Sequence, residues 1–166
     1  MIALYEGITF VPSRCIEFVN DSPYSHAAHI RELDGQCKEA WTDGGVRAVA
    51  SYRVRHTKGT RVALFRVRRE APEVEAAGGY DAVERNVDLF LNGQLGKDYD
   101  WPGIFRFITR GNERDTLNPP HWFCSRLVFT AYLVACVRLL NCPPWKVFPG
   151  MIAYSTILES DGTVRV

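Results

Sequence analysis

The stretch from Trp122 to Leu140 constrains the fold of this chain more than any other segment. It is apolar nearly all round, and Pro143-Pro144 closes it, because proline cannot continue a helix. Arg126 and Arg138 interrupt the stretch, which is typical of a buried core helix rather than a membrane span. The sequence therefore predicts a domain built around one buried helix.

The remaining segments alternate between strand and helix patterns. Strand patterns occupy 1–11, where Ile8, Phe10 and Val11 are apolar, and then 25–33, 36–41, 46–52 and 62–67. Helical patterns occupy 14–19 and 80–91, and residues 101–108 form either a further helix or an irregular segment. The tail 147–166 is expected to be extended. Since no repeat or linker interrupts the chain, residues 1–166 are predicted to form a single α+β domain with an antiparallel sheet.

Charge and composition exclude some classes of partner. Lys and Arg total 20 against 19 Asp and Glu, which gives a net charge of +1. No strong field therefore attracts nucleic acid or an anionic membrane surface. The 46% of apolar and 23% of charged residues are typical of a soluble globular protein. We expect a small or neutral partner, while the oligomeric state stays open.

The cysteines indicate a reducing environment. Their number, 5, is odd, and no CxxC spacing occurs, so neither a disulfide framework nor a zinc ribbon is predicted. The N-terminus lacks a basic segment followed by a long apolar run, so no signal peptide is expected. These features predict a cytoplasmic protein, although release by lysis would leave the same sequence.

Cys124 is the candidate nucleophile. It lies shortly after the Pro119-Pro120 break and falls in the first turn of the predicted buried helix. The partial positive charge and free N–H groups of a helix N-terminus stabilise a thiolate, and the same amides can stabilise an oxyanion. The alternative is a cysteine that packs as a small hydrophobic side chain.

His26 is the candidate general base among four histidines, the others being His29, His56 and His121. Strand alternation puts His26 on the same face as Ala28 and Ile30, which is predicted to be the core face. His26 and His29 then point to opposite sides of the strand, so the pair is not a metal chelate. The alternative for His26 is an interior histidine whose hydrogen bonds are satisfied.

Two carboxylates can orient the His26 ring, Glu39 and Asp43. Asp34-Gly35 predicts a two-residue hairpin turn, which would place Asp43 opposite His26 and Glu39 opposite Ile30. A longer loop would move Glu39 toward His26. The two-residue turn alone favours Asp43.

Four segments in this order resemble the NlpC superfamily of papain-like cysteine peptidases, in its circularly permuted YiiX/YebB-like branch. They are Tyr24 to Ile30, Lys38-Glu39-Ala40 with Gly44-Gly45-Val46, Gly96 to Trp101, and Trp122 to Val128. In this branch the histidine comes first and the cysteine last, and the lecithin:retinol acyltransferases are similar in layout. The chain departs from the family pattern at Arg126, where a glutamate is usual, and in a shortened stretch before Glu39.

The resemblance implies a papain-like fold in which the buried helix carries the nucleophile at its N-terminus. It assigns Cys124, His26 and Glu39 as catalytic residues, with Asp43 kept as the alternative to Glu39. The backbone N–H of Cys124 is an implied oxyanion donor, and Tyr24 and Ser125 are further oxyanion or substrate-binding candidates. No metal or organic cofactor is needed for this chemistry.

Three classes of function follow. The first is a cysteine hydrolase that cleaves an amide or peptide bond, such as those in cell-wall peptides. The second is a lipid-directed thiol hydrolase or acyltransferase, for which an apolar pocket could be lined by Trp101, Ile104, Phe105, Phe107, Trp122 and Phe123, unless these residues are simply core. The third is a non-catalytic binding domain on the same fold.

Overall fold

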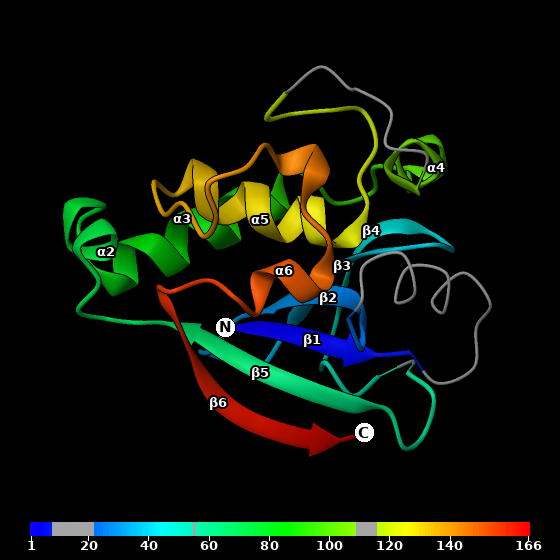
Figure 1. Ribbon diagram of the computed structural model, residues 1–166, viewed down its shortest axis with the longest axis horizontal. Helices are drawn as coiled ribbons and strands as arrows, with labels where there is room; N and C mark the ends of the chain where they lie inside the picture. The colour runs from blue at the N-terminus through cyan, green and yellow to red at the C-terminus, as the bar shows by residue number, and fades with distance from the viewer. Residues whose placement is uncertain (8–21, 55, 109–115) are drawn as a thin grey trace.

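The computed structural model describes residues 1–7, 22–54, 56–108 and 116–166 (Figure 1). A six-stranded antiparallel sheet has the strand order β4-β3-β2-β1-β5-β6. The strands are β1 (Ile2–Glu6), β2 (Tyr24–Ile30), β3 (Cys37–Trp41), β4 (Gly45–Val49), β5 (Arg61–Val67) and β6 (Leu158–Arg165). The sheet together with its helices confirms the α+β class.

The helices gather on one side of the sheet. They are α2 (Pro72–Ala76), α3 (Tyr80–Asn92), α4 (Trp101–Ile108), α5 (Cys124–Val134) and α6 (Pro149–Ile152), with a 3-10 turn η1 (Pro144–Lys146). Figure 1 shows α3 and α5 side by side above the sheet, with α6 between α5 and β2. Helix α5 is thus enclosed on both sides, which agrees with the buried helix that the sequence predicts.

Both faces of the sheet are buried. The helix-covered face contributes Ile2, Leu4, Ala27, Ala40, Val46 and Val67 to the main core. The opposite face forms a second, smaller cluster, which consists of Ala3, Tyr5, Ala28, Ile30, Cys37, Val62 and Leu64. The face with Ala28 and Ile30 is therefore buried as predicted, but it does not pack against α5. His26, which shares that face by alternation, must reach the start of α5 in another way.

Helix α5 is shorter than predicted at both ends. Trp122 lies in an extended bridge with Tyr99, so the first helical residue is Cys124. At the other end, Cys136 adopts a left-handed conformation with φ of 64°. The N–H of Val137 bonds to Tyr132 O at 2.9 Å, and that of Cys136 bonds to Leu133 O at 3.1 Å. This pair of bonds is a Schellman motif, which ends the helix well before Pro143.

The β2–β3 turn also differs from the prediction. His29 pairs with Lys38 and Ile30 with Cys37, and Arg31 N–H donates to Gln36 O at 2.8 Å. Residues 32–35 therefore form a four-residue loop instead of a two-residue turn. The longer loop moves Glu39 two positions along β2, away from Ile30 and toward His26. The predicted register was wrong, and it was the only argument for Asp43.

Other elements agree with the sequence in part. The helix predicted over 80–91 is confirmed as α3, and of the two alternatives for 101–108 the structure has the helix, α4. The short helix α2 was missed. The tail was expected to be extended, but it contains α6 before the strand β6. The first strand lies at Ile2–Glu6, and the expected strand residues 8–11 and helix 14–19 fall outside the described residues.

Candidate active site

Cys124 is the first residue of α5, and its side chain is buried at 3% exposure. The preceding chain is fixed by two backbone bonds, from Trp122 N–H to Asp98 O and from Asp100 N–H to Trp122 O, both at 3.0 Å. The extended segment 98–100 thus aims the helix N-terminus at the sheet. The first N–H groups of a helix have no intrahelical partner, so they remain available around the thiol.

The sulfur of Cys124 lies at a gap between β2 and β3. Pairing between these strands is described only at His29 and Ile30, so the edge of β2 at Ala27 is open. Ile30 bonds to Met1 on the β1 side, whereas Arg31 bonds toward β3. Because strand residues alternate in direction, Ala27 N–H also faces β3. This N–H donates to the Cys124 sulfur in place of a partner strand.

His26 joins Cys124 to Glu39. Its Nε2 lies 2.7 Å from Glu39 Oε2, and its ring also hydrogen-bonds to the Cys124 sulfur. Since Nε2 faces the carboxylate, Nδ1 is the nitrogen left for the sulfur. His26 therefore reaches α5 through the gap between β2 and β3, although its strand face turns away from the helix. The structure brings together the three residues that the resemblance assigns.

Glu39 is completely buried, and a cation holds its second oxygen. Arg47 is its direct cross-strand partner on β4 and donates to Oε1 from Nε at 2.9 Å and from Nη2 at 2.6 Å. A buried carboxylate needs such partners to stay ionised. Burial raises the pKa of Glu39, but the bonds from His26 and Arg47 outweigh it and lower the pKa to about 2.

The charges of this group support a thiolate–imidazolium pair. Burial opposes charge on His26, but Cys124 and Glu39 raise the pKa of the imidazole to about 10. Burial likewise raises the pKa of Cys124, and the attraction of His26 with the N–H bonds from Ala27 and Ser125 lowers it overall. Both shifts favour the thiolate–imidazolium form of the pair over its neutral form.

Aromatic rings surround the imidazole. Trp41 meets the His26 ring edge-on, with centroids 5.0 Å apart, and Tyr5 lies 5.3 Å away. His56 stacks on Tyr5 at 4.0 Å, and its Nε2 lies 3.7 Å from Glu39 Oε2. Burial and the charge of His26 lower the pKa of His56 to about 4. His56 is thus a neutral second histidine beside the same carboxylate.

The sequence missed several of these residues. Trp41 and Tyr5 carried no assignable role, and Arg47 was not singled out. A register count across Gly44-Gly45 could have found Arg47, because a three-residue turn at 42–44 puts it opposite Glu39. His56 lies beyond β4 in sequence, and no local pattern signals its contact with Glu39.

The other candidates, Asp43, Ser125 and Tyr24, have different surroundings. Asp43 is exposed in the turn between β3 and β4. The Ser125 hydroxyl is buried and donates to Val147 O at 2.7 Å, so it ties α5 to the segment before α6. The groups that act on the Tyr24 phenol are Glu6, Arg61 and Tyr154, and burial raises its pKa.

Tyr99 and Asp100, which belong to the resembling segment 96–101, lie near Cys124 and Arg126 respectively. Burial, and then the charge of Cys124, raise the pKa of Tyr99 well above its usual range, so this phenol lies near the sulfur. Asp100 Oδ2 lies 3.6 Å from Nη1 of Arg126, which is fully buried. The departure from the family pattern at Arg126 is therefore matched by a carboxylate within the chain.

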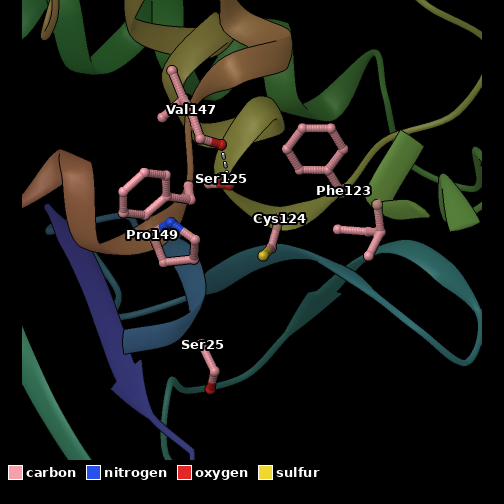
Figure 2. Close-up of a pocket in the computed structure, with 8 residues that line it drawn as sticks. Ser25, Phe123, Cys124, Ser125, Val147 and Pro149 are labelled. Carbon is pink, nitrogen blue, oxygen red and sulfur yellow. Dashed lines mark hydrogen bonds between the residues drawn. The ribbon is translucent and has the colours of Figure 1, made fainter. Parts of the chain in front are cut away.

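A small hollow opens beside the sulfur. It is lined by Ser25, Ile104, Phe123, Cys124, Ser125, Val147, Phe148 and Pro149. Figure 2 shows the Cys124 sulfur between Ser25 on one side and Phe123, Ser125 and Val147 on the other, with the Ser125–Val147 bond dashed. Of the predicted pocket residues, Ile104 and Phe123 line this hollow. Trp122 is core, and Trp101 is 47% exposed.

Among the residues that the structure describes, no group of three or more His, Cys, Asp or Glu side chains is placed to hold a metal ion. None of the described helices combines the length and apolarity needed to cross a membrane.

Comparisons with known proteins give a likeness of fold. No family model matches the chain, and no curated protein matches it. The structure is similar to the crystal structure of the metalloprotein yiiX from Escherichia coli O157:H7, DUF1105. The TM-score is 0.62 and the sequence identity 16%, over 97% of this chain and 94% of that one. At this identity the likeness shows a YiiX-like fold alone.

Proposed function

We propose that this protein is a papain-like cysteine hydrolase that cleaves an amide or peptide bond. Cys124 is the nucleophile, His26 the general base and acid, and Glu39 the residue that orients His26. The observation that carries the proposal is the position of the His26 ring, which bonds to Glu39 through one side and to the Cys124 sulfur through the other. The circularly permuted order, with histidine before cysteine, supports the same assignment.

The reaction follows from the charge distribution. The Cys124 thiolate attacks the carbonyl carbon and forms an S–C bond, and the carbonyl oxygen becomes an oxyanion. The Cys124 N–H at the start of α5 is the donor best placed to stabilise this oxyanion. The C–N bond then breaks, and the proton held by His26 passes to the leaving amine. The product of this half-reaction is a thioester on Cys124.

Water completes the cycle. His26, now neutral, accepts a proton from a water molecule as the water oxygen attacks the thioester carbonyl. The S–C bond breaks, and a carboxylic acid leaves the site. Throughout these steps Glu39 stays ionised, because Arg47 and His26 hold its pKa near 2. Its role is to keep Nδ1 of His26 directed at the sulfur.

The test is thiol labelling combined with turnover. Iodoacetamide at neutral pH should modify Cys124 in preference to Cys37, because burial raises the pKa of the Cys37 thiol. His26→Ala should slow this modification at least about tenfold, since it removes the cation that stabilises the thiolate. Equal modification of Cys124 in the wild type and in His26→Ala contradicts the assignment.

Turnover is measured on a panel of peptide amides, N-acyl amides and acyl esters. Cys124→Ala should lower kcat at least about 10⁴-fold while the unfolding transition is retained. Cys142→Ala is the matched control, since this half-buried cysteine follows α5 at the far end from the site. A thioester on Cys124, trapped by acid quenching and seen by mass spectrometry, supports the mechanism. Retained turnover in Cys124→Ala refutes it.

A further inference from the structure

The hollow beside Cys124 is lined mainly by apolar side chains. Apart from the sulfur and two serines, Ser25 and Ser125, its walls are aliphatic and aromatic side chains from three parts of the fold. Ile104 comes from α4, Phe123 from the start of α5, and Val147, Phe148 and Pro149 from the segment that leads into α6.

Few polar groups face the hollow. The Ser125 hydroxyl donates to Val147 O, which leaves the Ser25 hydroxyl as the second polar group of the lining. Apart from the Cys124 thiolate, no charged side chain is present among the described residues that line it. A charged group placed here would lose its hydration without gaining a countercharge from the walls. The mainly apolar lining therefore favours an uncharged, apolar group.

The size of the hollow sets an upper limit on that group. Its empty volume is about 250 Å³, counted to the open mouth. A short aliphatic chain or a compact side chain fits within this limit, whereas a long fatty chain would extend out of it.

Position relates the hollow to one part of the substrate. Cys124 itself is one of the lining residues. A substrate group that binds in the hollow is therefore close enough to the sulfur to be attached to the carbonyl carbon that the sulfur attacks. We propose that the hollow binds a compact, uncharged apolar group attached to the carbonyl that Cys124 attacks, such as a short acyl chain or an aliphatic amino-acid side chain. This inference rests on the proposed hydrolase function and names the substrate class of the same site.

The experiment uses 4-methylumbelliferyl esters of acetic, butyric, hexanoic, octanoic and palmitic acids, with the charged monosuccinyl ester as a comparison for butyryl. Wild-type kcat/KM should rise about fourfold for each methylene that enters the hollow, reach a maximum at butyryl or hexanoyl, and then fall. The succinyl ester should be about a hundredfold poorer than butyryl.

Variants of Ile104 test whether the hollow is responsible. Ile104→Ala enlarges it and should move the maximum to octanoyl, whereas Ile104→Phe fills it and should leave acetyl as the best substrate. Leu89→Ala is the control, because Leu89 is 70% exposed on α3 and does not line the hollow. Unfolding in urea shows that each variant is folded.

The outcomes separate the two proposals. No turnover and no thioester on Cys124 with any ester overturns the hydrolase function itself. A thioester on Cys124 with kcat/KM that is independent of chain length, or greatest for palmitoyl, keeps the hydrolase and overturns the role of the hollow. An unchanged maximum in both Ile104 variants also overturns it.

Discussion

Arg47 lies directly across the β3–β4 ladder from Glu39 and donates two hydrogen bonds to one oxygen of its carboxylate. The two arginine donors hold Oε1, which leaves the second oxygen, Oε2, to bond to His26. A cross-strand pair of this kind is set by register alone. The register of β3 and β4 therefore determines, through Arg47 and Glu39, how the His26 imidazole is oriented.

Replacing Arg47 by methionine should destabilise the protein. The change leaves the buried Glu39 carboxylate without its fork, and breaking a buried pair in this way costs about 3 kcal/mol. Glu39 has a depressed pKa, so its contribution to stability is present above about pH 4.3 and is lost as the pH falls toward 2. Without Arg47 the pKa of Glu39 rises, and the acid unfolding midpoint should move to higher pH.

The measurement is urea unfolding followed by acid titration of the circular dichroism signal. Arg47→Lys serves as the comparison, because it retains the positive charge without the bidentate fork, and it should fall between the wild type and Arg47→Met. An unaltered acid midpoint in Arg47→Met would show that Glu39 does not depend on this partner.

Glu39→Gln should narrow the pH range of activity. The carboxylate helps to raise the pKa of His26 to about 10, so its loss lowers that pKa and moves the alkaline limb of kcat/KM toward neutrality. The weaker cation stabilises the thiolate less, so the acid limb moves up. We expect kcat at the optimum to fall about 10²–10⁴-fold. If the acid and alkaline limbs of kcat/KM lie at the same pH in Glu39→Gln as in the wild type, Glu39 does not act on His26.

His56→Phe should change how stability depends on pH. The pKa of His56 is about 4 in the folded protein, against about 6.5 when unfolded. Between these values the unfolded state binds the extra proton, so His56 makes stability fall as the pH decreases. Phenylalanine keeps the ring against Tyr5 and removes the proton site. The slope between pH 5 and 6 should therefore decrease by about 1 kcal/mol per pH unit.

The slope is obtained from urea unfolding at closely spaced pH values within that window. The difference between the wild type and the variant isolates His56, because the other titrating groups are common to both proteins. Parallel stability curves would place His56 in a solvated environment.

Gly45→Ala should destabilise the fold more than Gly44→Ala. Both glycines have positive φ, of 66° and 92°, so each alanine carries a backbone strain of about 1–2 kcal/mol. At Gly45 a Cβ would also lie 2.1 Å from Lys97 O, where Val46 N–H bonds to the same carbonyl. At Gly44 the same atom meets nothing within 4 Å.

The expected difference between the two variants is at least about 2 kcal/mol in the free energy of unfolding, measured in urea. Because the segment after Lys97 continues to Tyr99 and the bridge with Trp122, Gly45→Ala should also slow alkylation of Cys124. Equal stabilities would mean that the close approach of β4 to Lys97 is not required.

The sequence predicted the elements whose signal is local. Helix α3 follows from its periodicity, and the start of α5 follows from Pro119-Pro120 and the apolar run after it. The end of α5 was wrong, because a left-handed Cys136 closes the helix and cysteine carries no such signal. Propensity favours glycine at that position.

The site was predictable only as far as its three assigned residues. The contact between His26 and Glu39 depends on the length of the 32–35 loop. The Asp34-Gly35 dipeptide predicted a two-residue turn, but Gly35 is the last residue of a four-residue loop. The resemblance gave Glu39 where the register count gave Asp43. The cation that holds Glu39 and the rings around His26 come from β4, β1 and the chain after β4, so they required the sheet order.

The open edge of β2 has a further consequence. The donor that it presents to the sulfur belongs to the main chain at Ala27, so it is the same whichever side chain stands there. Side-chain substitutions at Ala27 leave this donor in place, whereas proline at that position deletes it. Because Ala27 is fully buried in the main core, a larger side chain there should disturb the packing of the sheet face before it affects the contact with the sulfur.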